Sequence, residues 1–390
     1  MNKLTAIDLF SGAGGFSLAA HEVGFDILAA VEFDQHAANT YQHNIVDRLG
    51  ANTHVYAEDI TLLDINSLMD EKGLKAGDLD LLLGGPPCQG FSTHRIKGSG
   101  EDDPRNKLLL RYFDFVEKLM PKAFLVENVP GLLWPRHEAY LNCFLELAKE
   151  KNYKVITGAP LVINARDYGV PQSRRRAFIF AVRGDIVAEG LEWPPAPTHV
   201  KPDYEKGIQD NYWRSASIAF ERPPENVLAN LIPRMAEVLG WELDKAEKVV
   251  HSLQFGEPIE KDDFCNKHMT HKPFMVERFE DTKLMGSRDE LEFTLPCHQN
   301  GYSGHKDVYG RMFFHSPANT ITTGCTNPSK GRFLHPWENH GIKLRHAARL
   351  QTFPDDYQFL GGVMAAARQI GNAVPVNLGI SLIKNIKQWL

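Results

Sequence analysis

Long hydrophobic runs are missing from this 390-residue sequence. The apolar stretch at 79–83, LDLLL, is far shorter than the roughly 18 residues that would indicate a membrane span. The N-terminal MNKLTAIDLF is not followed by a small-residue cleavage site, and Asp8 interrupts its apolar run, so the sequence does not predict a secretory signal. We therefore expect no membrane association and a cytoplasmic location.

Cysteine and excess positive charge are also scarce. The five cysteines form no C-x-x-C pair and are odd in number, which predicts reduced thiols and argues against a disulfide framework. Lys and Arg number 43 against 49 Asp and Glu, giving a net charge of −6, so a polyanionic partner would need a local basic patch. With 43% hydrophobic and 24% charged residues, the composition is that of an ordinary globular protein and excludes disorder and collagen-like repeats.

The first 183 residues alternate between short apolar runs and longer amphipathic segments. Runs bounded by Gly, Asp or Pro predict buried parallel strands at 3–10, 27–33, 53–57, 79–83 and 123–129. Apolar residues at helical spacing predict helices at 16–23, 106–120 and 138–150. This alternation predicts an α/β fold with a doubly wound, mostly parallel sheet.

The composition changes at the proline-rich WPPAPTHVKP, which begins at Trp193 and predicts a domain boundary near 186–200. Beyond it, 225–253 predicts one or two helices and 255–340 is loop-rich, whereas 343–390 returns to regular helical and strand patterns. We expect one domain made of 1–185 with 342–390 and a second, smaller domain at 186–341.

The segment DLFSGAGGFSLA at 8–19 is a strand, a glycine-rich turn and the start of a helix. Gly12, Gly14 and Gly15 allow a ligand close to the backbone, and Glu32 lies about 20 residues on, where it could accept a ribose hydroxyl. The spacing departs from G-x-G-x-x-G, which favours a nucleoside cofactor without a pyrophosphate, such as S-adenosylmethionine, over NAD. Asp59, after the third strand, either binds the adenine amino group or caps the strand end.

A second motif, GGPPCQGFS at 84–92, places Cys88 at the carboxyl end of the fourth strand, where open α/β sheets bind their ligands. An isolated cysteine is more often a buried apolar residue, but the two rigid prolines favour a nucleophile here. The following 92–106 has the composition of a mobile lid, and equally that of a solvated loop.

Two further polar sets follow predicted strands. Glu127 ends the fifth strand, and a partly buried carboxyl beside Cys88 would suit a catalytic acid. In VPQSRRRAFIFAV, Gln172, Arg174 and Arg176 alternate, so a strand here would direct all three to one side, toward a polar base or a phosphate. Solvated charge is the alternative.

Taken in order, these motifs resemble the DNA (cytosine-5)-methyltransferase family, of the bacterial or phage modification type. The resemblance runs through SGAGGFS, Glu32, Asp59-Ile60, PPCQGFS, ENV and QSRRR, and then TITTG, RHAARLQTFPDD and QIGNAVPV. It covers 3–183 and about 315–390. It implies a methyltransferase sheet with an inserted target-recognition domain, which together hold double-stranded DNA from which the target cytosine is flipped.

The resemblance also implies a role for each matched residue. Cys88 would add to C6 of the cytosine, Glu127 would meet N3, Arg174 would bind O2 and Arg176 would support Glu127. The S-adenosylmethionine pocket would be lined by Phe10, Gly12, Gly14, Glu32, Phe33, Asp59, Ile60, Leu108 and Asn372. The residues expected to contact DNA, or to hold the strand that does, are Arg105, Gln172, Thr320 and Thr322.

Two alternatives to DNA methylation remain: a tRNA cytosine-5 methyltransferase with most of the same motifs, and a non-enzymatic DNA-binding paralogue. The family further implies a monomer that associates with the bacterial nucleoid and needs no metal. Any paired restriction endonuclease would act separately. Cys265, His268 and His271 with Cys297-His298 are ligand types for zinc, but their spacing fits no known zinc module. His346 stands where the family commonly has an acid, and we expect it to alter a domain contact.

Overall fold

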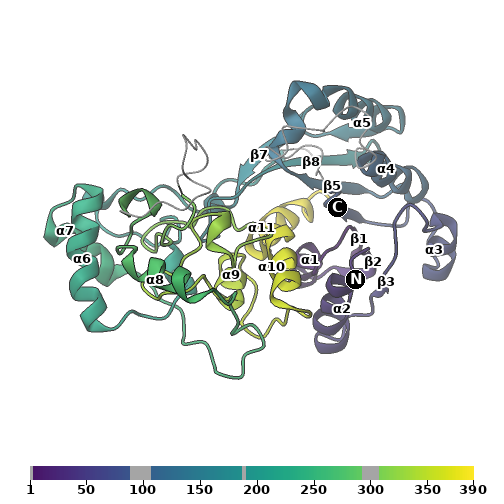
Figure 1. Cartoon of the computed structure of the whole chain (residues 1–390). Coiled ribbons are helices and arrows are strands. Elements are labelled where there is room, and N and C mark those ends of the chain that lie inside the picture. Colours follow the sequence, from purple (N-terminus) through teal and green to yellow (C-terminus); the bar gives the residue numbers. More distant parts are fainter. Residues whose placement is uncertain (1–2, 88–106, 187–189, 292–306) are drawn as a thin grey trace. The chain divides into compact units, whose positions relative to one another are not determined.

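The computed structural model describes residues 3–87, 107–186, 190–291 and 307–390. Within these ranges the chain forms two compact units, each described here by itself (Figure 1). Unit 1 comprises 1–168, 175–197 and 373–390, and unit 2 comprises 169–174 and 198–372. Among the described residues, no helix has the length and apolar character needed to cross a membrane.

Unit 1 is built on one eight-stranded sheet, with the strand order β3-β2-β1-β4-β5-β8-β6 and β7 paired to β8. The pairs from β3 through to β5 are parallel, whereas β8 runs antiparallel to β5, β6 and β7. The strands are β1 Thr5–Leu9, β2 Asp26–Val31, β3 His54–Tyr56, β4 Leu81–Gly84, β5 Ala123–Asn128, β6 Tyr153–Val155, β7 Leu161–Asn164 and β8 Arg175–Arg183. The doubly wound, mostly parallel fold predicted from the sequence is confirmed.

Helices cover both faces of this sheet. Side chains that alternate along β1, β4 and β5 join the apolar faces of α3, α4 and α5 in one core. On the other face α1 packs against α11 so closely that a methyl group on Gly379 would meet the Ala19 Cβ at 2.7 Å (Figure 1). The α-helices of unit 1 are α1 Gly15–Val23, α2 Gln35–Tyr41, α3 Ile65–Lys72, α4 Lys107–Leu119, α5 Glu138–Glu150 and α11 Val376–Ile386.

Shorter helical turns complete unit 1. A π-helix, η1 Gln42–Arg48, continues directly from α2. The 3-10 helices are η2 Pro130–Leu133, η3 Pro135–His137 and η4 Ala165–Tyr168. The short apolar runs form β1 to β5 and the predicted amphipathic segments form α1, α4 and α5, as the sequence pattern indicates.

Unit 2 consists of helices joined by long connections. Its α-helices are α6 Glu225–Leu239, α7 Leu243–Ser252, α8 Pro273–Asp281, α9 Leu344–Leu350 and α10 Val363–Asn372. Its 3-10 helices are η5 Tyr204–Lys206, η6 Ala216–Ala219, η7 Arg288–Glu290 and η9 Pro328–Lys330. Apolar faces of α6 and α7 meet in a small core with Phe314. The prediction of one or two helices at 225–253 is confirmed.

A buried arginine organises the long connections of unit 2. Arg311 is 3% exposed and donates hydrogen bonds to four backbone carbonyls, those of Thr282, His335, Glu338 and Phe279, and to the Asn339 side chain. Burial lowers the pKa of Arg311 to about 10. Segments without regular secondary structure are therefore held by one guanidinium in place of a strand ladder.

The compact units do not divide the chain at the predicted domain boundaries. Residues 342–372 and 169–174 pack within unit 2, and 186–197 pack within unit 1. The described part of 343–390 contains the helices α9, α10 and α11 and none of the expected strand pattern. The target-recognition role of 186–341 is a functional assignment and stays a prediction.

Candidate active site

The glycine-rich turn after β1 has a left-handed backbone at three positions. Phe10, Gly12 and Gly14 have φ angles of 58°, 55° and 88°. A non-glycine residue at positive φ is uncommon and costs about 1–3 kcal/mol, and such residues cluster at binding sites. Gly15 begins α1 and has no room for a side chain, because a Cβ there would lie 2.5 Å from the Val374 carbonyl oxygen. The turn is thus a tight backbone cradle in front of a helix N-terminus.

Glu32 holds this turn from the end of β2. Its two carboxylate oxygens accept the backbone N–H groups of Gly12 at 2.8 Å and Asp34 at 2.7 Å. Burial raises the pKa of Glu32 above its usual value, and these hydrogen bonds oppose the rise. Beside it, Phe33 is 74% exposed. A fixed acceptor next to an exposed aromatic ring suits the ribose and base of a nucleoside.

Asp59 lies in the turn after β3. Its Oδ1 accepts the backbone N–H of Thr61 at 2.9 Å and the Thr61 hydroxyl at 2.8 Å, while its Oδ2 makes no hydrogen bond with the described residues. Ile60, next in the chain, is 4% exposed. The carboxylate therefore stabilises its own turn with one oxygen and leaves the other for a donor, so the two sequence interpretations of Asp59 are compatible.

Asp8 is a buried acid that the sequence reasoning did not single out. It is 1% exposed, and its Oδ2 accepts the Ser17 hydroxyl at 2.7 Å in the first turn of α1. Burial raises the pKa of Asp8 to about 7, against the opposing hydrogen bond from Ser17. Asp8 therefore joins β1 to the first turn of α1 through the Ser17 side chain. The sequence did contain a signal for Asp8: it is an acid that lies four residues before the first glycine of the turn.

Glu127 and Arg176 form an ion pair across β5 and β8. Arg176 Nε lies 2.8 Å from Glu127 Oε1, and the two side chains are only 14% and 11% exposed. A Cβ built on Gly85 would lie 3.6 Å from Glu127 Oε2, and Asn128 Nδ2 donates to the Pro86 carbonyl at 3.4 Å. The carboxylate therefore lies beside the Gly85-Pro86-Pro87 segment that leads to residue 88. Cys88 and Arg105 themselves lie outside the described residues.

Gln172 and Arg174 do not share a strand with Arg176. The strand β8 begins at Arg175, and both residues belong to unit 2. The prediction that all three side chains face one side of a strand is therefore wrong, because the backbone turns before residue 175: the Gln172 N–H bonds the Val170 carbonyl at 2.7 Å.

Both side chains instead join backbone segments inside unit 2. Gln172 is 0% exposed; its Nε2 donates to the Leu350 carbonyl and to Gln351, and its Oε1 accepts the Ile321 N–H at 2.7 Å. Arg174 is 1% exposed and donates to the carbonyls of Ile321 and Gly371, each at 3.0 Å. Gln172 therefore joins the Ile321 and Leu350 segments, and its expected role at the DNA stays a prediction.

The other expected site residues are placed as follows. Thr320 is partly exposed, and its hydroxyl donates to the Ser173 carbonyl at 2.8 Å. Thr322 is partly exposed, and its backbone packs against Gly371 of α10. Asn372 is exposed at the end of α10 in unit 2, and Leu108 is partly buried on α4 in unit 1. Their contacts with DNA and cofactor stay predictions.

Cys265, His268 and His271, the described part of the ligand set considered for zinc, do not converge as metal ligands among the described residues. The buried Cys265 thiol contacts the Tyr357 carbonyl at 3.9 Å, and burial raises the pKa of Cys265 above its usual value. Burial likewise raises the pKa of Cys325 to about 12. Cys297 and His298 lie outside the described residues. Two of the described thiols are therefore held protonated and shielded, which is unlike a nucleophile.

One group of metal-ligand types does converge in unit 2, formed by Glu221, His335 and His346. His335 Nδ1 accepts the Glu338 N–H at 3.0 Å, and His346 Nδ1 accepts the Lys343 N–H at 3.3 Å. Each neutral ring then carries its proton on Nε2, and His346 Nε2 faces Glu221 Oε2 at 3.6 Å. To bind a metal, Nε2 would have to lose its proton and offer a lone pair. With the proton on Nε2, His346 instead acts as a donor toward the Glu221 carboxylate.

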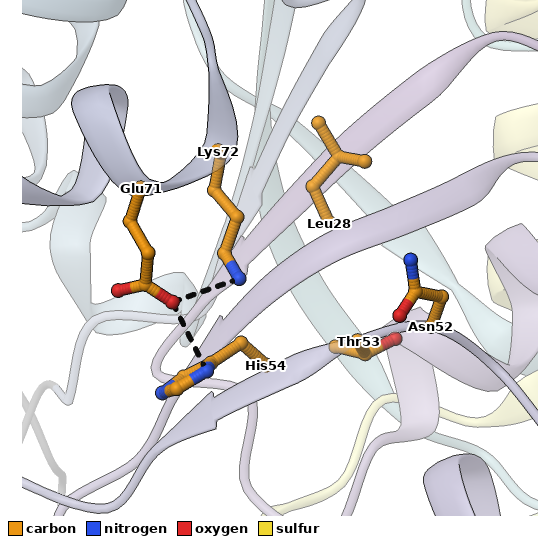
Figure 2. A pocket seen from close by; sticks show the side chains of 6 residues that line it. All are labelled: Leu28, Asn52, Thr53, His54, Glu71 and Lys72. Atoms are coloured by element: carbon orange, nitrogen blue, oxygen red, sulfur yellow. Dashed lines mark hydrogen bonds and ion pairs between the residues drawn. The ribbon is translucent and has the colours of Figure 1, made fainter.

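A hollow of about 340 Å³ lies elsewhere in unit 1, and Figure 2 shows its lining. It involves Leu28 in the first half of β2 and His54 at the start of β3, so it lies away from the strand ends that carry Glu32 and Asp59. Lys72 and His54 both pair with Glu71, at 3.1 and 3.2 Å (Figure 2). The charges of the hollow therefore compensate one another.

The motifs follow one another in the order that the DNA cytosine-5 methyltransferases have, and comparison with known families gives the same class. The chain belongs to the C-5 cytosine-specific DNA methylase family, whose model matches residues 4–388. It is 29% identical to the Type II methyltransferase M.AgeI of Thalassovita gelatinovora, over 98% of this chain and 99% of that protein. It is 31% identical to the Type II methyltransferase M1.HphI of Haemophilus parahaemolyticus, over 96% of this chain and 84% of that protein.

A solved structure agrees. The fold matches that of a DNA modification methyltransferase encoded within a prophage of E. coli, with a TM-score of 0.66, 25% identity and 99% of each chain covered. The protein is therefore an enzyme that methylates C5 of cytosine in DNA, and the tRNA and non-enzymatic alternatives are not supported.

Proposed function

We propose that this enzyme methylates a cytosine flipped out of a specific double-stranded DNA sequence, through a covalent bond between Cys88 and C6. C5 of cytosine is a weak nucleophile, so a thiolate must first add to C6 and raise the electron density at C5. Flipping is required because the ring atoms cannot be reached inside the base stack. The observation that carries the proposal is the Glu127–Arg176 pair beside the segment that leads to Cys88.

In the addition step, the Cys88 sulfur bonds C6 and the proton that the thiol gives up is taken up at N3. Glu127 would lie against N3 and stabilise this protonated adduct, and Arg176 would hold the carboxylate in place. After C5 is methylated, loss of the C5 proton and cleavage of the sulfur–C6 bond release 5-methylcytosine and the free thiol. The C5 proton passes to solvent and the N3 proton returns to the Cys88 sulfur, so the thiol is regenerated and no metal is required.

The methyl donor we propose is S-adenosylmethionine, whose sulfonium supplies an electrophilic methyl group when it is bound. The residues present fit such a molecule: the left-handed turn at Gly12 and Gly14 leaves backbone accessible, and Glu32 and Asp59 offer carboxylate oxygens. The exposed ring of Phe33 offers a stacking surface for adenine. Leu108, Ile60 and Phe10 complete the proposed pocket within unit 1, and Asn372 of unit 2 stays a predicted cofactor contact.

Arg174 would bind cytosine O2, and its hydrogen bonds to the Ile321 and Gly371 carbonyls would hold the guanidinium in place with two of its five N–H donors. Thr320, Thr322 and Arg105 remain the proposed DNA contacts. We further propose that the enzyme acts as a monomer on the bacterial nucleoid, as the modification partner of a separate endonuclease where one is present.

The test is methyl transfer from tritiated S-adenosylmethionine to genomic DNA and, separately, to total tRNA, followed by bisulfite sequencing. We expect label in DNA at one recurring cytosine context. Cys88→Ala should retain DNA and cofactor binding and give no product, whereas the control Cys143→Ala, on α5, should keep its activity. Turnover by Cys88→Ala would refute the covalent mechanism, and label in tRNA alone would refute the DNA substrate.

A duplex with 5-fluorocytosine at the target tests the adduct directly. Fluorine cannot leave C5 as a proton does, so the bond to C6 should persist. We expect a stable protein–DNA complex whose mass spectrum places the cross-link at Cys88, and no complex with Cys88→Ala.

A further inference from the structure

Arg111 on α4 joins the helix to the turn that carries Asp59. Its Nε donates to the Ile60 carbonyl at 3.0 Å and its Nη2 to the Leu63 carbonyl at 2.7 Å. Its Nη1 pairs with Asp114 at 3.0 Å, one turn along the helix. All three nitrogens of the guanidinium are thus engaged, and two of them hold backbone outside any helix or strand.

The clamp adds directed hydrogen bonds to an apolar attachment, because Ile60 and Leu63 are 4% and 7% exposed and share a core with Phe113 of α4. Among the described residues, the side-chain hydrogen bonds made within the turn are those of Asp59 with Thr61, which shape the turn but do not attach it to a neighbouring element. Leu62 at its tip is 78% exposed and adds no anchor. A guanidinium fork that binds two carbonyls fixes both position and orientation, which a single ammonium donor cannot do.

We propose that Arg111 is a positioning residue for the adenine end of the cofactor pocket. By holding 60–63 against α4, it keeps the unengaged Asp59 Oδ2 and the Ile60 side chain in register with Leu108, one helical turn before it on the same helix. This inference rests on the proposed cofactor pocket. Arg111 touches no reacting atom; it sets where Asp59 can accept the adenine amino group.

The chain offers a matched control at the other end of α4. Arg183 also donates to two backbone carbonyls, those of Gly77 and Met120, and pairs with an aspartate, Asp185. It lies at the end of β8, far along the chain from the Asp59 turn. Arg183→Met therefore removes the same kind of clamp from the same unit without touching the proposed pocket.

The experiment measures binding of S-adenosylhomocysteine, and of its analogue with hypoxanthine in place of adenine, to the full chain by titration calorimetry. Hypoxanthine lacks the amino group, so the ratio of the two dissociation constants reports the Asp59 contact. A hydrogen bond to a charged acceptor predicts a ratio of about ten to a hundred for the unaltered protein. Arg111→Met should weaken binding of the adenine compound about tenfold and bring the ratio close to one, with kcat at saturating cofactor retained.

Three further arms separate the outcomes. Asp59→Ala should bring the ratio of the two dissociation constants close to one. Adding Arg111→Met to Asp59→Ala should not weaken binding of the adenine compound further. Arg111→Lys keeps the charge and one donor, should fold if the methionine variant does not, and should give an intermediate ratio. Arg183→Met should leave the ratio unchanged. An unaltered ratio in Arg111→Met or Arg111→Lys would overturn the inference alone, whereas failure of the unaltered protein to bind either compound would overturn the proposed pocket with it.

Discussion

Replacing Gly371 by alanine should weaken unit 2 by an amount that the structure allows us to estimate. A methyl carbon there would lie 2.3 Å from the Thr322 carbonyl carbon and 2.4 Å from its oxygen. Both are backbone atoms, so no rotamer change can make room, and α10 must move by about 1 Å to restore ordinary contact.

That movement would also lengthen the hydrogen bonds that Arg174 donates to the Ile321 and Gly371 carbonyls. Its guanidinium bridges the Ile321 carbonyl on one side of the contact and the Gly371 carbonyl on the other, each at 3.0 Å. Separating the two by 1 Å breaks one of them, which costs about 1.5–3 kcal/mol for a charged donor. Overpacking adds about 1–3 kcal/mol, and the better helix propensity of alanine returns about 1 kcal/mol. The expected net loss is about 3 kcal/mol.

The matched control is Gly362→Ala, because a Cβ at Gly362 would meet nothing within 4 Å and its φ is not positive. Because Gly362 directly precedes α10, this change should lower the free energy of unfolding by no more than about 1 kcal/mol. Urea unfolding and thermal melts of both variants provide the measurement, and we expect the Gly371 variant to melt roughly 6–12 °C lower. Equal melting of the two variants would refute the reasoning.

Two further predictions concern buried charges in unit 2. Burial lowers the pKa of His346 to about 4, although Glu221 beside it opposes the shift. Between about pH 6.5 and 4 the unfolded chain therefore binds a proton that the folded protein does not. As the pH is lowered through this window, the free energy of unfolding should decrease by up to about 3 kcal/mol. His346→Gln should reduce the slope of unfolding free energy against pH by about 1.4 kcal/mol per pH unit there, and an unchanged slope in urea titrations would contradict the assignment. Arg311→Met leaves four carbonyls and an amide without their donor and should cost at least about 4 kcal/mol, whereas the exposed Lys261→Met should cost less than about 0.5 kcal/mol; equal urea midpoints would show that the carbonyls find other donors.

The fold of unit 1 could be predicted because its parallel strands are short, apolar and separated by clear helical periods. The antiparallel direction of β8 could not, since side-chain alternation is the same in either direction. The start of β8 could not be predicted either. Alternating polar residues suggested that Gln172 and Arg174 lie in the strand, but their spacing does not say where the strand begins.

Some residues of the candidate site could be predicted from the sequence and others could not. Residues in motifs, such as Glu32 and Glu127, could be named because glycine turns and strand ends mark where ligands bind in this kind of sheet. Asp8 and Arg111 could not, since each is a single charged residue within an apolar pattern, and its importance lies in partners distant in sequence. Arg111 and the Ile60 carbonyl, for example, are 51 positions apart.

The interleaving of the two units has a consequence for how the protein is made. Gln172 leaves the ribosome 178 positions before the Leu350 carbonyl that it binds, and the last residues, 373–390, belong to unit 1. At about 5–20 residues per second, Gln172 waits roughly 10–35 s for that partner. Neither unit can be complete before residue 372 has been made, so a chain that stalls between residues 342 and 372 leaves both units unfinished.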